Sequence, residues 1–338
     1  MKVLIIKLSS IGDCIHTLPA VASLREGFKK KGIKARIDWL VEEAASSVLT
    51  HSRLVDNVIV VKRGWLRNYR ENRRVASALA ATRYDLVLDF QGLLKSGVWV
   101  YLSNGVKRAG FSNAREMSHL FLNDRLPPYD PEKHAVDRYL ELAVHAGGAA
   151  GPARFQVDTG KAAKSAENKL KGVGVGREPF FAMVSQARWP TKLWSEGSFV
   201  ELARRLIDKT GFKAVLVGGP GDRAALEDIK DKIGAGAINL AGLTDLPELA
   251  EVLRRARFAV TVDSGPMHLA AAVGTRCVSI FGPTAPWRTG PYGTGHIVVR
   301  KGLDCSPCFS RKCADPECMT GITVDDILAA MGPILIEG

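Results

Sequence analysis

The chain has 338 residues, of which 46% are hydrophobic and 24% charged, and its formal net charge is +12. These ordinary fractions exclude a collagen-like, coiled-coil or largely disordered chain, and the length suits about two domains, each with its own core. The apolar runs fall short of the ~20 residues of a membrane-spanning helix, and the first run, Val3–Ile6, is too short for a signal peptide. We therefore expect a globular, cytoplasmic protein.

Positive charge is concentrated in the first half of the chain. Residues 1–150 contain 23 basic and 15 acidic residues, a net charge of +8, which leaves +4 of the total +12 for the remainder. Because positive surfaces attract anionic molecules, the first half is expected to bind the more anionic partner.

Short apolar strands alternate with helices along the first half. The run Lys2–Lys7 predicts a buried strand, which is followed by the turn Ser9–Asp13 and by an apolar stretch at helical spacing. Further strands are predicted over Ala35–Val41, Asn57–Val61 and Tyr84–Phe90, and a helix over Arg73–Ala81. This alternation predicts a parallel, doubly wound sheet.

The alternation is interrupted between Gly147 and Lys171 and then resumes, which predicts domains over residues 1–160 and 161–338. The later elements are strands over Phe180–Val184, Ala214–Val217 and Phe258–Val262 and helices over Ser198–Asp208, Arg223–Lys232, Leu246–Arg255 and Met267–Val273. The simplest architecture is α/β, with two Rossmann-like halves facing a central cleft. The final stretch, Val324–Ile336, is a candidate helix that packs back on the first domain.

The segment Ala259–Gly274 has the pattern of a strand that leads into a ligand-binding helix. The turn Asp263–Gly265 follows the strand, and Pro266 suits the first helical position. The N–H groups and positive dipole end of such a helix can hold a phosphate, with further hydrogen bonds from Ser264 and His268. The alternative is an ordinary N-cap, with the histidine buried or solvated.

Two further loops follow strands of the second half. The loop Ser185–Trp194 carries Arg188 and Lys192, and Lys192 is either a solvated surface lysine or a cation that neutralises a diphosphate. The loop Gly218–Asp222 ends in a carboxylate that either binds a ribose hydroxyl or caps a plain turn. A P-loop motif is absent from the sequence, and the glycines of Gly172–Gly176 do not stand between a predicted strand and a predicted helix, so neither a P-loop NTPase nor an NAD enzyme is supported.

Five motifs stand in one order along nearly the whole chain: Val3–Asp13, Asp89–Ser96, Thr191–Trp194, Val262–His268 and Phe281–Thr284. Together they resemble glycosyltransferase family 9, the bacterial lipopolysaccharide heptosyltransferases of GT-B fold. The resemblance implies transfer of heptose from ADP-heptose to the inner core of lipopolysaccharide, with inversion at the anomeric carbon. It implies no catalytic cofactor, and a peripheral position at the cytoplasmic face of the inner membrane.

The resemblance also implies roles for particular residues. Asp13 matches the general base, which accepts the proton of the attacking sugar hydroxyl, although its spacing alone favours a helix N-cap. Lys192 is expected to stabilise the negative charge of the departing ADP. Asp222 stands where the family often has a Glu on the nucleotide ribose. The residues expected to bind the donor are Ser185, Arg188, Lys192, Asp222, Asp263, Ser264, Gly265 and His268.

The acceptor is expected to bind basic residues of the first half. The segment Lys62–Arg74 contains six basic residues and one acidic residue, with Trp65 and Tyr69 interleaved. Its arginines at 63, 67, 70 and 74 recur at near-helical spacing, which predicts one cationic face suited to acidic Kdo sugars and lipid A phosphates. The alternative is a solvated charged loop. The expected acceptor-binding residues are Lys62, Arg63, Arg67, Lys95 and Arg115.

The acceptor is either Kdo-lipid A or heptosyl-Kdo-lipid A. The segments Gln91–Ser96 and His134–Arg138 resemble enzymes that transfer the first heptose, whereas the Cys-rich tail resembles enzymes that transfer the second. We favour the first transfer.

Four of the six cysteines form a C-x2-C-x4-C-x4-C cluster near the end of the chain. This spacing is that of a zinc knuckle with Cys in place of the usual His, so a structural zinc or iron site is one interpretation, and reduced packing residues are the other. The candidate ligands are Cys305, Cys308, Cys313 and Cys318.

Two other functions fit parts of the sequence. The knuckle spacing and the pI near 9.5 are typical of a nucleic-acid-binding protein, but the basic excess lies in the other predicted domain, so no nucleic-acid partner is expected. A GT-B enzyme with a different reaction, such as a sugar-nucleotide epimerase or a transferase with another donor, is the nearer alternative. Heptosyltransferase ranks first, another GT-B enzyme second and a nucleic-acid module third.

Overall fold

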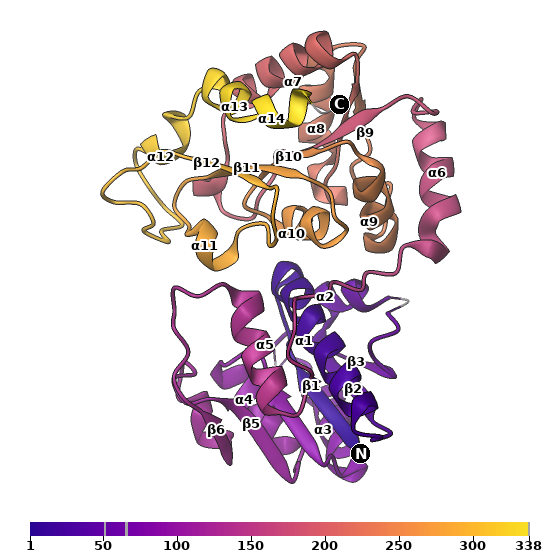
Figure 1. Ribbon diagram of the computed structural model, residues 1–338, viewed down its shortest axis with the longest axis vertical. Coiled ribbons are helices and arrows are strands. Elements are labelled where there is room, and N and C mark those ends of the chain that lie inside the picture. Colours follow the sequence, from indigo (N-terminus) through magenta and orange to yellow (C-terminus); the bar gives the residue numbers. More distant parts are fainter. Residues whose placement is uncertain (51, 65–66, 337–338) are drawn as a thin grey trace. The chain divides into compact units, whose positions relative to one another are not determined.

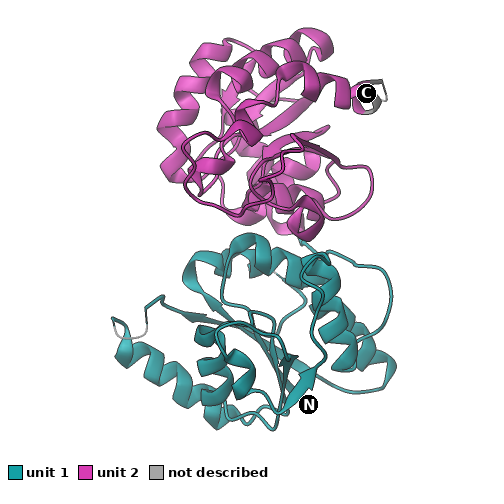
Figure 2. Ribbon diagram, turned by 90° about the vertical axis from the view of Figure 1, so that its left-hand side faces the viewer, with its two compact units in different colours: residues 1–158 teal, residues 159–338 magenta. Residues whose placement is uncertain are grey.

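The computed structural model describes residues 1–50, 52–64 and 67–336. The chain forms two compact units, Met1–Asp158 and Thr159–Gly338 (Figure 2). Each unit contains a parallel sheet of six strands, with helices packed against it (Figure 1). The expectation of two doubly wound α/β halves is therefore confirmed.

In unit 1 the strand order is β3-β2-β1-β4-β5-β6. The strands are β1 (Lys2–Ile6), β2 (Arg36–Glu42), β3 (Asn57–Val61), β4 (Leu86–Asp89), β5 (Lys107–Phe111) and β6 (Asp124–Leu126). The helices are α1 (Ile11–Lys30), α2 (Glu43–Ser46), α3 (Tyr69–Thr82), α4 (Leu94–Leu102) and α5 (Ala135–His145). Val3 and Ile5 of β1 pack in one hydrophobic cluster and Leu4 and Ile6 in another, so both faces of the sheet are buried.

In unit 2 the strand order is β12-β11-β10-β7-β8-β9. The strands are β7 (Phe180–Val184), β8 (Lys213–Leu216), β9 (Ala237–Asn239), β10 (Ala259–Val262), β11 (Cys277–Phe281) and β12 (Ile297–Arg300). The helices are α6 (Ala163–Gly172), α7 (Glu196–Thr210), α8 (Arg223–Ile233), α9 (Leu246–Arg255), α10 (Gly265–Ala272), α11 (Pro286–Thr289), α12 (Glu317–Thr320), α13 (Val324–Ala330) and α14 (Gly332–Ile336). Every residue of β7 is buried, as expected for a central strand covered on both faces.

Each sheet reverses its strand order at one point. In unit 1 the chain builds outward from β1 to β3 and then returns to add β4 on the other side of β1, while in unit 2 the same step joins β7 to β10. The loops that follow the two strands at such a point diverge and leave a crevice at the carboxyl edge of the sheet, where open α/β sheets bind ligands. The loops after β1, β4, β7 and β10 are therefore the places to look for a site.

Two expectations about helices are wrong. Helix α3 begins at Tyr69, after a turn in which Gly64 has a φ of +87°, so Arg63 and Arg67 precede the helix and do not share a face with Arg70. The final stretch is not one helix, because it is broken into α13 and α14, and Ile327 of α13 lies in the core of unit 2, where α13 contacts α7 and β12. That this stretch packs back on the first domain stays a prediction.

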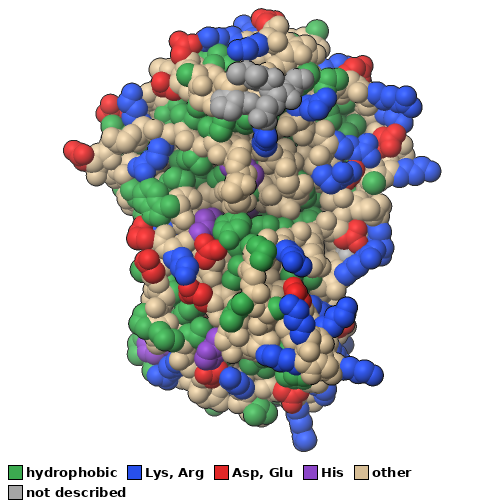
Figure 3. All heavy atoms as spheres, in the orientation of Figure 1, with side chains coloured by type: hydrophobic (Ala, Val, Ile, Leu, Met, Phe, Trp, Pro, Cys, Tyr) green, Lys and Arg blue, Asp and Glu red, His purple; other side chains and the backbone are tan. Residues whose placement is uncertain are grey.

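The surface carries mixed charge. On the face drawn in Figure 3, Lys and Arg side chains stand among Asp and Glu side chains on both units. Within the described ranges, no helix combines the length and the apolar character needed to cross a membrane.

Glu251 of α9 is a buried carboxylate held by two arginines. It accepts hydrogen bonds of 2.7 Å from Nε and Nη2 of Arg254 and from Nε of Arg255. Burial raises the pKa of Glu251, but these hydrogen bonds outweigh burial and lower it to about 2. Because this pKa lies below the ordinary value of 4.5, the stabilisation is complete above about pH 4.5 and is lost as the pH falls towards 2.

We expect Glu251→Gln to lower the free energy of unfolding by about 1–3 kcal/mol at pH 7 and by much less at about pH 3. Thermal melting at the two pH values measures the difference. Glu201→Gln is the matched control, because Glu201 pairs with Arg205 at 3.3 Å on the surface of α7, where such a pair contributes little. Equal losses for Glu251→Gln at both pH values would contradict the argument.

Candidate active site

Asp13 lies in the first turn of α1, at the carboxyl end of β1. Its Oδ2 accepts hydrogen bonds of 2.9 Å from the N–H and from the Oγ of Ser10. Ser10 is therefore the N-cap residue and Asp13 completes a capping box three residues later, so the alternative in which Asp13 itself is the N-cap does not hold. The side chain of Asp13 remains 38% exposed, so that a substrate hydroxyl can reach the carboxylate.

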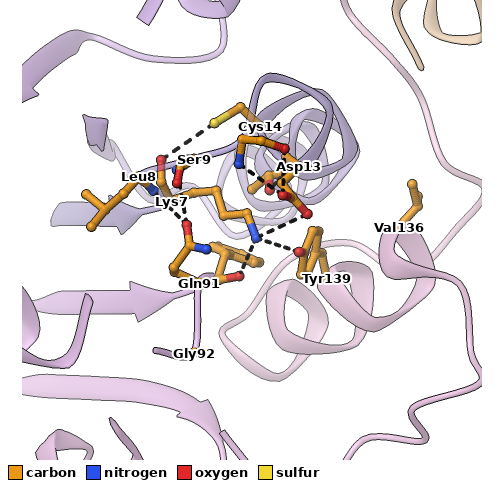
Figure 4. A network of polar contacts seen from close by, with 12 residues as sticks. Lys7, Leu8, Ser9, Asp13, Cys14, Gln91, Gly92, Val136 and Tyr139 are labelled. Atoms are coloured by element: carbon orange, nitrogen blue, oxygen red, sulfur yellow. Dashed lines mark hydrogen bonds and ion pairs between the residues drawn. The ribbon is translucent and has the colours of Figure 1, made fainter. Parts of the chain in front are cut away.

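Lys7 lies beneath Asp13, where β1 ends (Figure 4). Its Nζ donates hydrogen bonds to Oη of Tyr139 at 2.6 Å and to the carbonyl oxygen of Phe90 at 3.0 Å, and it lies 3.9 Å from Oδ1 of Asp13. Burial lowers the pKa of Lys7, but the attraction of Tyr139 and Asp13 outweighs burial and raises it, so the ammonium stays charged.

Hydrogen bonds join the loop after β4 to the loop after β1. Oε1 of Gln91 accepts hydrogen bonds of 3.1 Å from the N–H groups of Leu8 and Ser9 (Figure 4). Oδ1 of the buried Asp89 in turn accepts from the N–H groups of Gln91 and Gly92, each at 3.0 Å. Burial raises the pKa of Asp89, although these hydrogen bonds oppose the rise. The two loops at the reversal point of unit 1 thus form one connected structure beside Asp13.

Two of the expected acceptor-binding residues lie at this connected structure. Nζ of Lys95 donates hydrogen bonds of 2.8 Å to Oγ of Ser9 and to Oε1 of Glu42. Arg115 is exposed, and its N–H donates to the carbonyl oxygen of Gly92 at 3.0 Å. Both cations therefore stand near the turn that carries Asp13.

The other expected acceptor-binding residues follow β3, at the same edge of the sheet. Lys62, Arg63 and Arg67 are exposed, and Nζ of Lys62 pairs with Glu71 at 3.2 Å. Trp65 lies outside the described residues. Lys62, Arg63 and Arg67 thus precede α3, so their charges do not belong to one continuous cationic helix with Arg70 and Arg74.

In unit 2 the loops after β7 and β10 meet through an ion pair. Nζ of Lys192 lies 2.6 Å from Oδ2 of Asp263, which also accepts a hydrogen bond of 2.6 Å from Oγ1 of Thr284. The side chains of Lys192 and Asp263 are only 16% and 6% exposed. The solvated-lysine interpretation of Lys192 is therefore wrong, because the lysine is held at the reversal point of the second sheet.

Helix α10 begins directly after Asp263. Ser264 is its N-cap residue, but its Oγ is buried and, in the described part of the chain, has no hydrogen-bond partner. Gly265 and Pro266 form the first positions, and His268 is buried in the first turn. The hydroxyl of Ser264 and the N–H groups of this helix start are thus available to an anionic ligand beside Lys192.

The remaining donor-side candidates differ in their surroundings. Ser185 is buried directly after β7, whereas Arg188 is exposed on the same loop. Oδ2 of Asp222 accepts a hydrogen bond of 2.8 Å from the N–H of Gly219, so this carboxylate already caps its own turn. The turn-capping alternative for Asp222 therefore fits the geometry, and a ribose contact would have to use its other oxygen.

A cation pair on Trp189 was not predicted from the sequence. Nζ of Lys192 lies 4.5 Å, and the guanidinium carbon of Arg311 4.7 Å, from the centre of the Trp189 ring. Oγ1 of Thr191 donates a hydrogen bond of 2.8 Å to the carbonyl oxygen of Ser310, which joins the tail segment to the same loop. Because Ser310 lies 119 positions after Thr191, no local sequence pattern predicts that the tail segment contacts this loop.

Most of the chain matches one known protein family. Residues 72–318 match the family model for glycosyltransferase family 9 (heptosyltransferase). This chain belongs to glycosyltransferase family 9. The lipopolysaccharide heptosyltransferase 1 of Pseudomonas aeruginosa is 33% identical over 324 residues, covering 93% of this chain and 87% of the relative. The lipopolysaccharide heptosyltransferase 2 of Salmonella typhimurium is 29% identical, covering 89% of this chain and 91% of the relative.

A solved structure supports the same assignment. The E. coli heptosyltransferase WaaC with ADP is 28% identical to this chain, with a TM-score of 0.79 over 99% of this chain and 100% of that one. The expected GT-B fold is therefore confirmed, and so is the expectation of a glycosyltransferase.

Of the two interpretations of the four C-terminal cysteines, a metal site or reduced packing residues, the structure of this glycosyltransferase gives no support to the first. Cys318 is buried on α12, whereas Cys305, Cys308 and Cys313 are exposed along the preceding loop. Burial and the nearby thiols of these three residues raise the pKa of Cys318. Among the residues that the structure describes, no group of three or more His, Cys, Asp or Glu side chains is arranged to hold a metal ion. The interpretation as a structural zinc or iron site is therefore unsupported.

Proposed function

We propose that this glycosyltransferase moves a heptose from ADP-heptose to the inner core of lipopolysaccharide, and that its acceptor is Kdo-lipid A. Relatives named lipopolysaccharide heptosyltransferase 1 are 32–33% identical to this chain, whereas relatives named heptosyltransferase 2 are 26–29% identical. The single observation that carries the proposal is the pair of charged sites at the reversal points of the two sheets: the exposed carboxylate of Asp13 and the buried Lys192–Asp263 pair.

The proposed reaction is one displacement at the anomeric carbon. The acceptor oxygen forms the new bond while its proton passes to the Asp13 carboxylate, and the bond to the ADP phosphate oxygen breaks on the opposite face of the sugar. Lys192 and the start of α10 then stabilise the charge that develops on ADP. Since these groups supply the positive charge, the proposal uses no catalytic cofactor.

The two units have separate tasks in this proposal. Unit 2 binds the nucleotide sugar through Lys192, the N–H groups of α10 and the hydroxyl of Ser264, with Ser185, Asp263 and His268 beside them. Unit 1 binds the acceptor at the carboxyl edge of its sheet, where the exposed cations of the loops after β3 and β5 face solvent. An acceptor held in a bilayer requires the enzyme to work at the membrane surface, so we place it as a peripheral protein at the cytoplasmic face of the inner membrane.

The basic loop after β3 is expected to control the affinity for the acceptor. We expect Arg63→Ala with Arg67→Ala to raise KM for Kdo-lipid A about tenfold and to weaken its dependence on salt, with a smaller effect on kcat, because exposed charges act through screened attraction. Initial rates at several ionic strengths measure both effects. Arg53→Ala is the control, since Arg53 pairs with Asp158 at 3.1 Å. An unchanged KM would assign acceptor binding to another surface.

The proposed function is tested by ADP release from ADP-heptose, measured with and without Kdo-lipid A. We expect release only with the acceptor, and an acceptor product heavier by one heptose in mass spectrometry. Release only with an acceptor that already carries one heptose would reassign the enzyme to the second transfer. Release only with another nucleotide sugar would overturn the donor.

A further inference from the structure

The proposed reaction gives no task to the ammonium of Lys7, a buried cation beside Asp13. The side chain of Lys7 is only 3% exposed, and its Nζ has hydrogen bonds to Oη of Tyr139 and to the carbonyl oxygen of Phe90. The same ammonium lies 4.6 Å from the centre of the Tyr139 ring. Keeping a charge out of water is costly unless partners compensate, so this arrangement needs a reason.

An ion pair with a carboxylate compensates for the burial of the Lys7 ammonium. In the described part of the chain its carboxylate partner is Asp13, with Oδ1 at 3.9 Å from Nζ. Oδ2 of Asp13 is already occupied by the two hydrogen bonds from Ser10, so the carboxylate is held from both sides (Figure 4). The buried cation and the helix start thus fix the orientation of one exposed carboxylate.

Other ionisable groups around this pair come from several elements. Burial raises the pKa of Cys14 to about 12, and burial also raises the pKa of Tyr139, so both groups are neutral near pH 7. Besides Asp13, the groups that interact with Lys7 are Cys14 of α1, Asp89 of β4 and Tyr139 of α5. Glu42 of β2 and Lys95 of α4 interact with Cys14, Arg138 interacts with Tyr139, and the ring of His16 lies against that of His134.

We propose that Lys7, held in place by Tyr139, is the positioning residue that keeps Asp13 ionised and aimed at the acceptor hydroxyl. The inference rests on the proposed function, in which Asp13 takes the proton of that hydroxyl. Lys7 keeps its own proton throughout: the hydroxyl proton passes to Asp13, and the electron pair of the O–H bond forms the new bond to the sugar. A cation next to the carboxylate favours its charged form, so Lys7 sets the lowest pH at which the base is available.

The test is the pH dependence of kcat/KM in variants without the charge. In Lys7→Met we expect the acidic limb of the profile to move up by about one to three pH units, because an opposite charge at this distance depresses a carboxylate pKa by that amount. Lys7→Gln is the second variant, since its amide can still donate to Tyr139 and Phe90 but carries no charge. Lys7→Arg keeps a charge and is expected to restore the limb.

Two further variants separate positioning from folding. Lys2→Met is the matched control on the same strand, since Nζ of Lys2 donates to the carbonyl oxygen of Thr82 at 2.8 Å and has no contact with Asp13. We expect it to leave the profile unchanged. Tyr139→Phe removes the hydroxyl but leaves the cation, so it is expected to lower kcat without moving the acidic limb upward.

A second readout needs no turnover. Titration of the Asp13 side-chain carboxyl by 13C NMR, assigned with Asp13→Asn, is expected to show the same upward shift in Lys7→Met and Lys7→Gln. An unchanged Asp13 titration in folded charge-removing variants would overturn the role of Lys7. Because this titration requires no substrate, it remains informative where the wild type fails to release ADP, an outcome that would overturn the proposed function alone.

Discussion

Replacing Asp13 by Asn is expected to lower kcat by about 10²–10⁴-fold, the usual contribution of a general base. The amide has nearly the same shape, and its oxygen can still accept the hydrogen bonds that Ser10 donates at 2.9 Å. The start of α1 should therefore remain intact, while the group that accepts the proton is lost. Steady-state rates with saturating donor and acceptor measure the effect.

Two controls make the Asp13 result specific. Binding of ADP to the variant, measured by calorimetry, is expected to be unchanged, because the proposed donor site lies in unit 2. Asp85→Asn is the matched substitution, since Oδ2 of Asp85 also accepts a backbone N–H, that of Lys2 at 2.6 Å, but lies before β4, at the amino edge of the sheet. If Asp13→Asn retained more than about a tenth of kcat, another group would have to be the base.

The most accurate predictions are those of strands and helices whose ends are marked by residues nearby in the sequence. The strands Asn57–Val61 and Phe180–Val184 and the helix Leu246–Arg255 have the predicted bounds, because apolar runs mark the two strands and the capping residue Asp245 marks the start of the helix. The last two strands of the first sheet, β5 and the edge strand β6, were missed. Their sequences, Lys107–Phe111 and Asp124–Leu126, are short and begin with charged residues, so they form strands only because the neighbouring strand pairs with them.

For the candidate site, too, the sequence indicated residues that stand in local motifs but not the contacts between residues far apart in the chain. Asp13 was assigned as the base from the family resemblance, and Lys192 was singled out because it stands in a loop that follows an apolar strand; both roles stay predictions. The surroundings that give them their properties were not identified, since Lys7 and Tyr139 are 132 positions apart and Thr191 and Ser310 are 119 apart. Contacts at such separations are made by the sheet topology, and a single sequence carries no local sign of them.

The cysteine cluster is a local pattern that left two interpretations open. Its spacing fits a zinc knuckle, yet spacing alone does not bring four sulfur atoms to one centre. Cys318 is buried on a helix and Cys313 is exposed, with its Sγ donating to the carbonyl oxygen of Asp315 at 3.1 Å. The backbone path, rather than the number of residues between ligands, decides whether a tetrahedral site can form.

The second large effect is expected for Lys192→Met, which should lower kcat by about 10²–10³-fold, as for other groups that stabilise developing charge. The lysine is largely buried and its Nζ lies 2.6 Å from Oδ2 of Asp263, so the substitution removes a preorganised cation from the place where ADP would depart. It also leaves a buried carboxylate without its counter-ion, which is expected to cost about 3–5 kcal/mol of stability. Rates and thermal melting measure the two effects separately.

The double variant Lys192→Met with Asp263→Asn separates the two causes. The amide that replaces the carboxylate carries no charge, and it can still accept the hydrogen bond that Thr284 gives to Asp263 at 2.6 Å, so most of the lost stability is expected to return. The rate is not expected to return, because the cation is still absent when negative charge develops on ADP. Recovery of kcat together with stability would show that Lys192 acts by holding Asp263 in place. The departing phosphate would then need another cation. Arg311 is the candidate, because its guanidinium carbon lies 4.7 Å from the centre of the Trp189 ring that Lys192 also contacts.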